Sequence, residues 1–142
     1  MIRGVAGIVA GLITWFLVAT AGNRLLRVSW PSYVQAEKPL KFTLGMMAAR
    51  LVLGALSSVC AGFVVAWVIT KSNGMAAKVL GIALIAMFIP VHYGLWDKFP
   101  TWYHLTFLVS LLPLTLVGAT LKAQPDVERL KGPAPPLHNS ER

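Results

Sequence analysis

Acidic side chains are scarce in this chain. Its 142 residues include five Asp and Glu against 13 Lys and Arg, and only 13% of the sequence is charged. An ordinary soluble domain carries about 25% charged residues, so the composition predicts a membrane protein instead. The formal net charge of +8 does not indicate nucleic-acid binding, because no soluble module carries a basic patch. Basic residues at helix ends would instead meet anionic lipid.

Cysteine and the common catalytic motifs are also missing or nearly so. The single cysteine, Cys60, lies in an apolar run, cannot form an intrachain disulfide, and is expected to be a buried structural thiol. The sequence has no Gly-rich phosphate loop followed by Lys and Ser or Thr, no HExxH, no Gly-x-Ser-x-Gly and no paired carboxylates. We therefore expect no catalytic residue, no metal site and no cofactor, and an enzyme is not favoured.

Long hydrophobic runs dominate what is present. The chain is 56% hydrophobic with a mean hydropathy of +0.68, and a bilayer core requires about 20 apolar residues per helix. The runs predict an all-α membrane protein, a bundle of four transmembrane helices with short loops. Residues 1–121 form this domain, and residues 122–142 form a disordered, Pro-rich tail. The predicted spans are residues 5–23, 43–70, 75–95 and 102–121.

The first run has a second interpretation. Ala19-Thr20-Ala21 resembles a small-residue cleavage site, and Arg3 precedes the apolar core as in a secretory signal peptide. However, the basic region is minimal, and the run continues past residue 21 without a clear polar break. A retained first span is therefore the favoured interpretation.

Prolines divide the rest of the chain. In the linker 24–41, Pro31 is expected to start a short helical turn and Pro39 to end it, either in the membrane interface or as a solvated loop. Pro90 and Pro113 lie within the third and fourth spans and are candidates for kinks. Gly74, after a short polar turn, suits a helix end.

Small residues recur at helical spacing and indicate where helices pack. Gly7 and Gly11 form a GxxxG pair in the first span, and Gly54, Ser58 and Gly62 form a stripe along the second. The second span is therefore expected to be the packing centre. The expected partners are the lipid bilayer, a second copy of the chain or a subunit of a membrane complex, and no nucleic acid.

Topology follows from the even number of spans, which puts both termini on one side. Seven Lys and Arg lie on that side and five on the other, so both termini are expected in the cytoplasm. The expected location is the bacterial inner (plasma) membrane.

Chain reversal also brings the few polar groups to one membrane face. The candidate cluster consists of Asn23, Glu37, Arg50, His92, Asp97 and His104. Arg50 lies inside its span, where a charge is costly. It could snorkel to the headgroups, form a structural pair with an acid, or belong to a ligand site. Of the two acids on this side, Asp97 is the favoured partner, because its short loop holds it near the bundle.

His92 and His104 flank the corner between the last two spans. Two imidazoles facing each other across helices can hold haem or a metal. No cysteine or carboxylate cluster accompanies them at ligand spacing, so hydrogen-bonding interface histidines are the favoured interpretation.

Three segments carry a resemblance: LWDKFPTWYHLTFL at the corner, NRLLRVSWP in the linker and MMAARLVLGALSS in the second span. With them, residues 1–121 resemble a group of uncharacterised small bacterial four-span integral membrane proteins, which implies no activity. The chain is also similar in size to the small multidrug resistance exporters. Those proteins need a membrane-buried glutamate in the first helix, and this first span contains no acid.

Three functions remain open at this point. The leading hypothesis is a non-enzymatic accessory, assembly or structural subunit, because packing signals are abundant and chemistry is sparse. The alternative is a small transporter or ligand-binding bundle with a polar vestibule at the face of the first and third loops. The third is a redox protein that binds haem or a metal through its histidines.

Overall fold

The computed structural model describes residues 2–69 and 74–130, and these are helical apart from short connections. Four of the helices are long and apolar enough to cross a membrane, as the hydrophobic runs predicted. The protein is thus an all-α membrane protein built on four long helices. In chain order the elements are α1 (Ile2–Ser29), α2 (Pro31–Glu37), α3 (Leu44–Val68), α4 (Met75–Gly94) and α5 (Thr101–Leu130).

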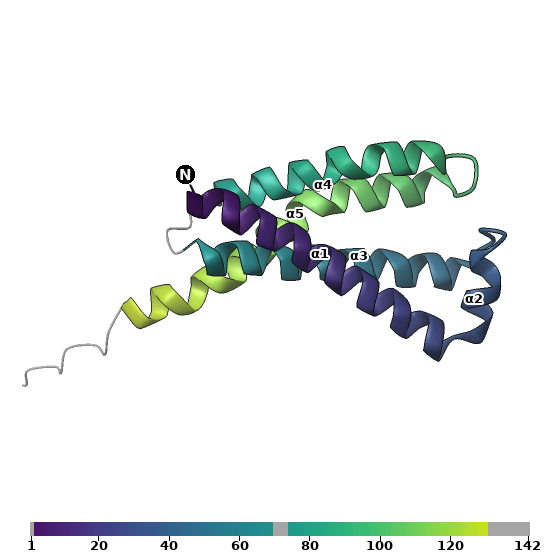
Figure 1. Cartoon of the computed structure of the whole chain (residues 1–142), viewed down its shortest axis with the longest axis horizontal. Helices are drawn as coiled ribbons and strands as arrows, with labels where there is room; N and C mark the ends of the chain where they lie inside the picture. The colour runs from purple at the N-terminus through teal and green to yellow at the C-terminus, as the bar shows by residue number, and fades with distance from the viewer. Residues whose placement is uncertain (1, 70–73, 131–142) are drawn as a thin grey trace, which may run out of the picture.

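The four long helices alternate in direction (Figure 1). The beginning of α1 and the end of α5 lie at one end of the molecule. At the other end lie α2 and the turn that joins α4 to α5. This arrangement places the first linker and the corner between the last two spans on one face, as chain reversal predicted. We call this the α2 end.

Local sequence explains several boundaries. Pro31 occupies the start of α2, where its missing N–H costs nothing. The Thr43 hydroxyl accepts a hydrogen bond from the Met46 N–H (3.4 Å) and caps α3. Gly74 precedes α4 with φ at 67°, a left-handed conformation that favours glycine.

Two helices are longer than their predicted spans. The first continues beyond residue 23 to Ser29, and α5 continues beyond residue 121 to Leu130. Polar and charged residues mark where an apolar span ends, but they do not end a helix, whereas Pro31 does. The remainder of the predicted tail, residues 131–142, lies outside the described residues. Near its middle α5 changes direction (Figure 1), and Pro113 is in this part of the helix.

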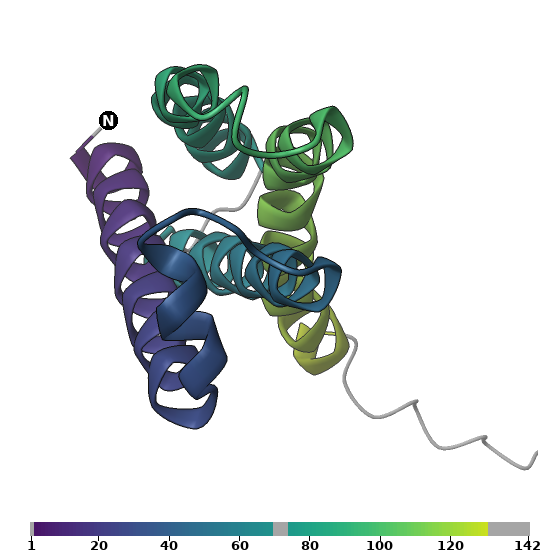
Figure 2. The same ribbon diagram turned by 90° about the vertical axis from the view of Figure 1, so that its right-hand side faces the viewer.

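Helix α3 is the centre of the packing, between α1 and α5 (Figure 2). Its stripe of small residues faces its neighbours: a Cβ added at Gly62 would collide with the backbone carbonyl of Thr115 on α5. Likewise, a Cβ at Gly118 of α5 would collide with the carbonyl oxygen of Val59. At this end, therefore, α3 and α5 meet backbone to backbone. Cys60 is exposed, so the expectation of a buried thiol is wrong; two residues from Ser58 and from Gly62, it lies on the opposite face of α3.

The hydrophobic core fills the middle of the bundle. Its members come from all four long helices, and Leu80, Leu84 and Leu111 are almost completely buried. Trp15 of α1 and Phe107 of α5 complete the core toward the α2 end. Beyond these two rings the side chains become polar, and a cavity begins.

Candidate functional site

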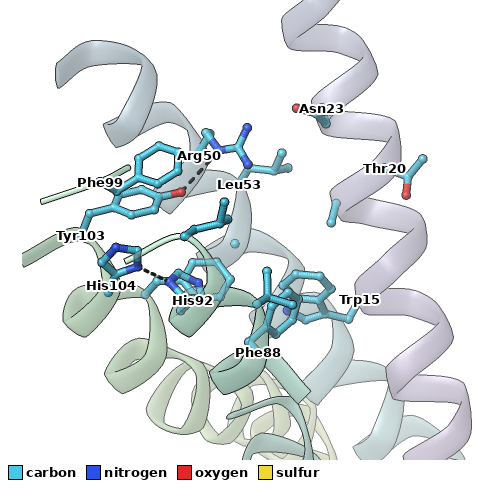
Figure 3. A pocket seen from close by; sticks show the side chains of 15 residues that line it. Trp15, Thr20, Asn23, Arg50, Leu53, Phe88, His92, Phe99, Tyr103 and His104 are labelled. Atoms are coloured by element: carbon cyan, nitrogen blue, oxygen red, sulfur yellow. Dashed lines mark hydrogen bonds between the residues drawn. The ribbon is translucent and has the colours of Figure 1, made fainter. Parts of the chain in front are cut away.

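An open cavity of about 310 Å³ lies between α1, α3, α4 and α5 toward the α2 end. Figure 3 shows Asn23, Arg50 and Tyr103 at one end of this cavity, and Trp15 and Phe88 at the other. Four residues of the polar cluster that the sequence suggested line this cavity together: Asn23, Arg50, His92 and His104.

Arg50 is held by two phenols and one aromatic ring. Its Nη1 donates to the Tyr33 hydroxyl (3.0 Å), and its Nε donates to the Tyr103 hydroxyl (3.3 Å). The guanidinium carbon lies 4.9 Å from the centre of the Phe42 ring, a cation–π contact. All three partners are neutral. The positive charge of Arg50 is therefore positioned but not cancelled.

Tyr33 links three helices. Helix α2 folds back against the bundle, so that Tyr33 is fully buried. Its hydroxyl donates to the Asn23 side-chain oxygen of α1 (2.9 Å) while accepting from Arg50 of α3. Burial raises the pKa of the Tyr33 phenol above its ordinary value of 10.0, and the nearby Arg50 only partly opposes this. Tyr33 thus remains a neutral hydroxyl that orients both Asn23 and Arg50.

The two acids of the predicted cluster lie outside the cavity. Glu37 accepts a hydrogen bond from Nε of Arg27 at the end of α1 (2.7 Å) and forms an ion pair with Nη2 of the same residue (2.6 Å). Asp97 is exposed and borders a separate hollow with Tyr93 and Trp96. The favoured Arg50–Asp97 pair is therefore not formed. The buried residue of the corner is Phe99, whereas Trp96 and Asp97 are both exposed.

His92 and His104 are hydrogen-bonded to each other across α4 and α5. Their Nδ1 atoms lie 2.7 Å apart, so one ring donates a proton and the other accepts it (Figure 3). His104 is completely buried beneath Trp96, whose ring stacks on it at 4.9 Å. Within the described residues, His104 Nε2 has no hydrogen-bond partner.

The distance between the two Nδ1 atoms bears on the metal hypothesis. A tetrahedral zinc with Zn–N bonds of about 2.0–2.1 Å would hold two ligand nitrogens about 3.3 Å apart. The observed distance of 2.7 Å between the two Nδ1 atoms is that of a direct hydrogen bond. In the described residues no group of three His, Cys, Asp or Glu side chains is placed to hold a metal ion.

Trp15 and Phe88 line the inner end of the cavity. The Trp15 indole N–H donates to the Ser58 hydroxyl (3.1 Å), which in turn donates to the Gly54 carbonyl (2.8 Å). The Trp15 ring packs against Phe88 at 4.7 Å. The inner end of the cavity is thus lined by aromatic rings, and the indole N–H of Trp15 already has a hydrogen-bond partner, in contrast to the polar Arg50 end.

The other predicted packing residues also have neighbours within the chain. The side chain of Ile69, just after α3, and the carbonyl oxygen of Val65 lie against Gly7. The side chains of Val65 and Leu80 lie against Gly11. Gly54 faces the ring of Phe107 on α5. The small residues thus serve contacts between helices of this chain.

Sequence reasoning missed the phenols and Trp15. Tyr33 in the linker and Tyr103 at the corner are aromatic residues of the kind that is common at a membrane interface, and nothing in the sequence marks them as partners of Arg50. Comparisons of the chain with protein-family models, with curated proteins and with solved structures found no match.

Proposed function

We propose that this protein is a membrane-embedded ligand-binding bundle that holds an anionic group in its cavity, with Arg50 as the main recognition residue. One observation supports this most directly. Arg50 borders the cavity, is held by neutral hydroxyls, and has no carboxylate within salt-bridge distance in the described part of the chain.

The energetics favour an anion at this position. A charged side chain in the middle of a membrane helix costs about 2.5–3.5 kcal/mol on insertion scales, and less nearer the surface. Phenols hydrogen-bond the guanidinium but supply no opposite charge. A bound carboxylate or phosphate would supply that charge and use the planar donor face of arginine. Asn23 offers a neutral amide beside it.

The cavity suits binding better than open conduction. Toward the opposite end of the molecule the bundle is closed by buried core residues, including Leu80 and Leu111. Further along, α3 and α5 touch through Gly62 and Gly118. A vestibule with one mouth fits a binding or sensing role, and a transport role would require the closed end to open.

The same contacts weigh against an accessory or assembly role as the first choice. That hypothesis rested on small-residue stripes available to a partner. Gly7, Gly11, Gly54 and Gly62 are instead covered by side chains or backbone of this chain. We place the protein in a bacterial inner membrane with cytoplasmic termini, as the distribution of Lys and Arg favours, and the cavity then faces the periplasmic side. The resemblance to small bacterial four-span proteins agrees with this location.

The test compares Arg50 with another arginine of the same chain. Purified protein in nanodiscs is titrated with two phosphate monoesters, methyl phosphate and dodecyl phosphate. We expect at least one to bind, and Arg50→Met to weaken it by about tenfold or more. Arg50→Lys, which keeps the charge, should bind with intermediate affinity. Arg24→Met, which removes an exposed arginine that does not line the cavity, should bind as the wild type does.

Two outcomes would reject the proposal. One is that neither ester binds to the wild-type protein. The other is that Arg50→Met, folded as judged by its helical circular dichroism and its elution volume, binds as well as wild type does.

A further inference from the structure

We propose that the anionic ligand is a single-chain lipid, which enters the cavity sideways from the bilayer between α1 and α4. This inference rests on the proposed function and names the class of its ligand. Three features of the cavity support a lipid ligand. They are the change from polar to aromatic lining with depth, the aromatic rings around Arg50, and the opening between α1 and α4.

Polarity changes along the cavity in the order that a lipid requires. Asn23 and Arg50 lie at the α2 end, and Trp15 and Phe88 lie at the inner end (Figure 3). Trp15 precedes Asn23 by eight residues on α1, which is roughly 12 Å along a helix. A headgroup at Arg50 would therefore place its chain against the Trp15 and Phe88 rings, deeper in the membrane. A soluble anion would use only the polar end.

Aromatic rings cover Arg50 at the α2 end. The Phe99 ring stacks on Phe42 at 5.7 Å and on Tyr103 at 5.1 Å. Phe42 in turn lies against the Arg50 guanidinium, and Tyr33 is buried beside it. Together, these rings pack around the Arg50 side chain and leave it only partly exposed. They restrict the approach of a hydrated anion from the face where the loops meet water.

The open side of the cavity faces the seam between α1 and α4. Thr20 of α1 and Val91 of α4 both line the cavity, and both are exposed. This seam is weakly packed, because α1 packs mainly on α3 and α4 mainly on α5. In a bundle of this kind the outer surface of such a seam meets lipid. The mouth is thus placed for exchange with the bilayer.

The size of the cavity limits what is enclosed. A volume of about 310 Å³ is at the lower end of the range of ligand pockets, roughly 300–1,000 Å³. It can hold a headgroup and the first part of one chain. The rest of the lipid chain would pass through the seam between α1 and α4 into the hydrocarbon of the bilayer. It would therefore remain in an apolar environment. This fits a ligand that is already a component of the membrane.

The test uses three probes that separate headgroup from chain. Wild-type protein in phosphatidylcholine nanodiscs is titrated with dodecyl phosphate, methyl phosphate and dodecyl maltoside. We expect dodecyl phosphate to bind at least tenfold more tightly than each of the other two. Arg50→Met should abolish the preference for dodecyl phosphate over dodecyl maltoside.

Variants at the mouth test the route. Val91→Trp, which fills the seam, should weaken dodecyl phosphate binding at least fivefold. Val109→Trp, at an exposed position on α5 that does not line the cavity, should leave it unchanged. Arg50-dependent binding of methyl phosphate as tight as that of dodecyl phosphate would overturn the lipid assignment and leave the proposed function intact. Binding of neither ester would reject both. Equal effects of the two tryptophan variants would overturn the route between α1 and α4.

Discussion

The two halves of α3 meet α5 in opposite ways. In the C-terminal half, Gly62 lies against the backbone of Thr115, and the two helices touch without intervening side chains. In the N-terminal half, Gly54 instead meets the ring of Phe107, and one turn further along, Arg50 reaches Tyr103 at the edge of a cavity. The same spacing of small residues thus gives a closed contact at one end and an open site at the other.

The residue on the opposite helix makes the difference. The distance between two helices is set by the side chains at their contact, so a glycine allows close approach only where the partner offers backbone. Phe107 and Tyr103 keep α5 away from α3 at the α2 end, and this separation leaves room for a ligand. A stripe of small residues is therefore necessary for tight packing but does not ensure it.

The largest expected effect on stability comes from adding one methyl group, by a Gly→Ala substitution, in each half of α3. In Gly62→Ala the new Cβ meets a backbone carbonyl that cannot move alone, so we expect a loss of about 2–3 kcal/mol. In Gly54→Ala the nearest atom is Cε2 of Phe107, 2.8 Å away. That ring borders the cavity and can shift into it, so the loss should stay below about 1 kcal/mol. Gly4→Ala, with nothing within 4 Å, should be neutral.

Reversible unfolding in mixed detergent micelles measures all three variants. Equal destabilisation by Gly62→Ala and Gly54→Ala would remove the contrast between the two halves, and with it the explanation given for the cavity.

A smaller effect is expected at the histidine pair, which joins α4 to α5 on the cavity side. His92→Phe and His104→Phe each remove one partner of the 2.7 Å hydrogen bond and leave the other nitrogen unpaired. Each single variant should lose about 1–3 kcal/mol. The double variant should lose less than the sum, by about 0.5–1.5 kcal/mol, in a double-mutant cycle of unfolding free energies. Strict additivity would show that the pair does not couple the two helices.

Much of this fold can be predicted from the sequence, because lipid imposes simple rules. Apolar length predicts the four spans, and Pro31 predicts α2. Because successive spans run in opposite directions, Asn23, Arg50, His92 and His104 come to one membrane face. This prediction does not depend on how the helices pack.

The partners of Arg50 could not be predicted in the same way. They depend on the rotation of each helix about its own axis and on α2 folding back to bury Tyr33, which are set by packing of the whole bundle. Charge and the short corner loop suggested Asp97, but that acid is exposed and does not line the cavity. Neutral phenols carry no charge pattern along the sequence that would mark them as partners of an arginine.

The smallest expected effect tests whether the cavity end depends on a neutral Tyr33. Burial raises the pKa of this phenol, so the folded protein holds the proton more tightly than the unfolded chain does. The corresponding stability is complete below the unfolded pKa of 10.0 and is lost as the pH rises through the higher folded value. Thermal unfolding followed from about pH 8 to about pH 11 should therefore show a steeper alkaline decline for wild type than for Tyr33→Phe.

Tyr93→Phe is the matched control for that comparison, because Tyr93 is 81% exposed. It should decline as wild type does, because this substitution removes no buried hydroxyl. If Tyr33→Phe also kept the wild-type slope, the ionisation of Tyr33 would not be coupled to folding. Among the contacts described above, the C-terminal half of α3 has no tyrosine. An alkaline decline in stability assigned to Tyr33 would therefore report on the cavity end alone.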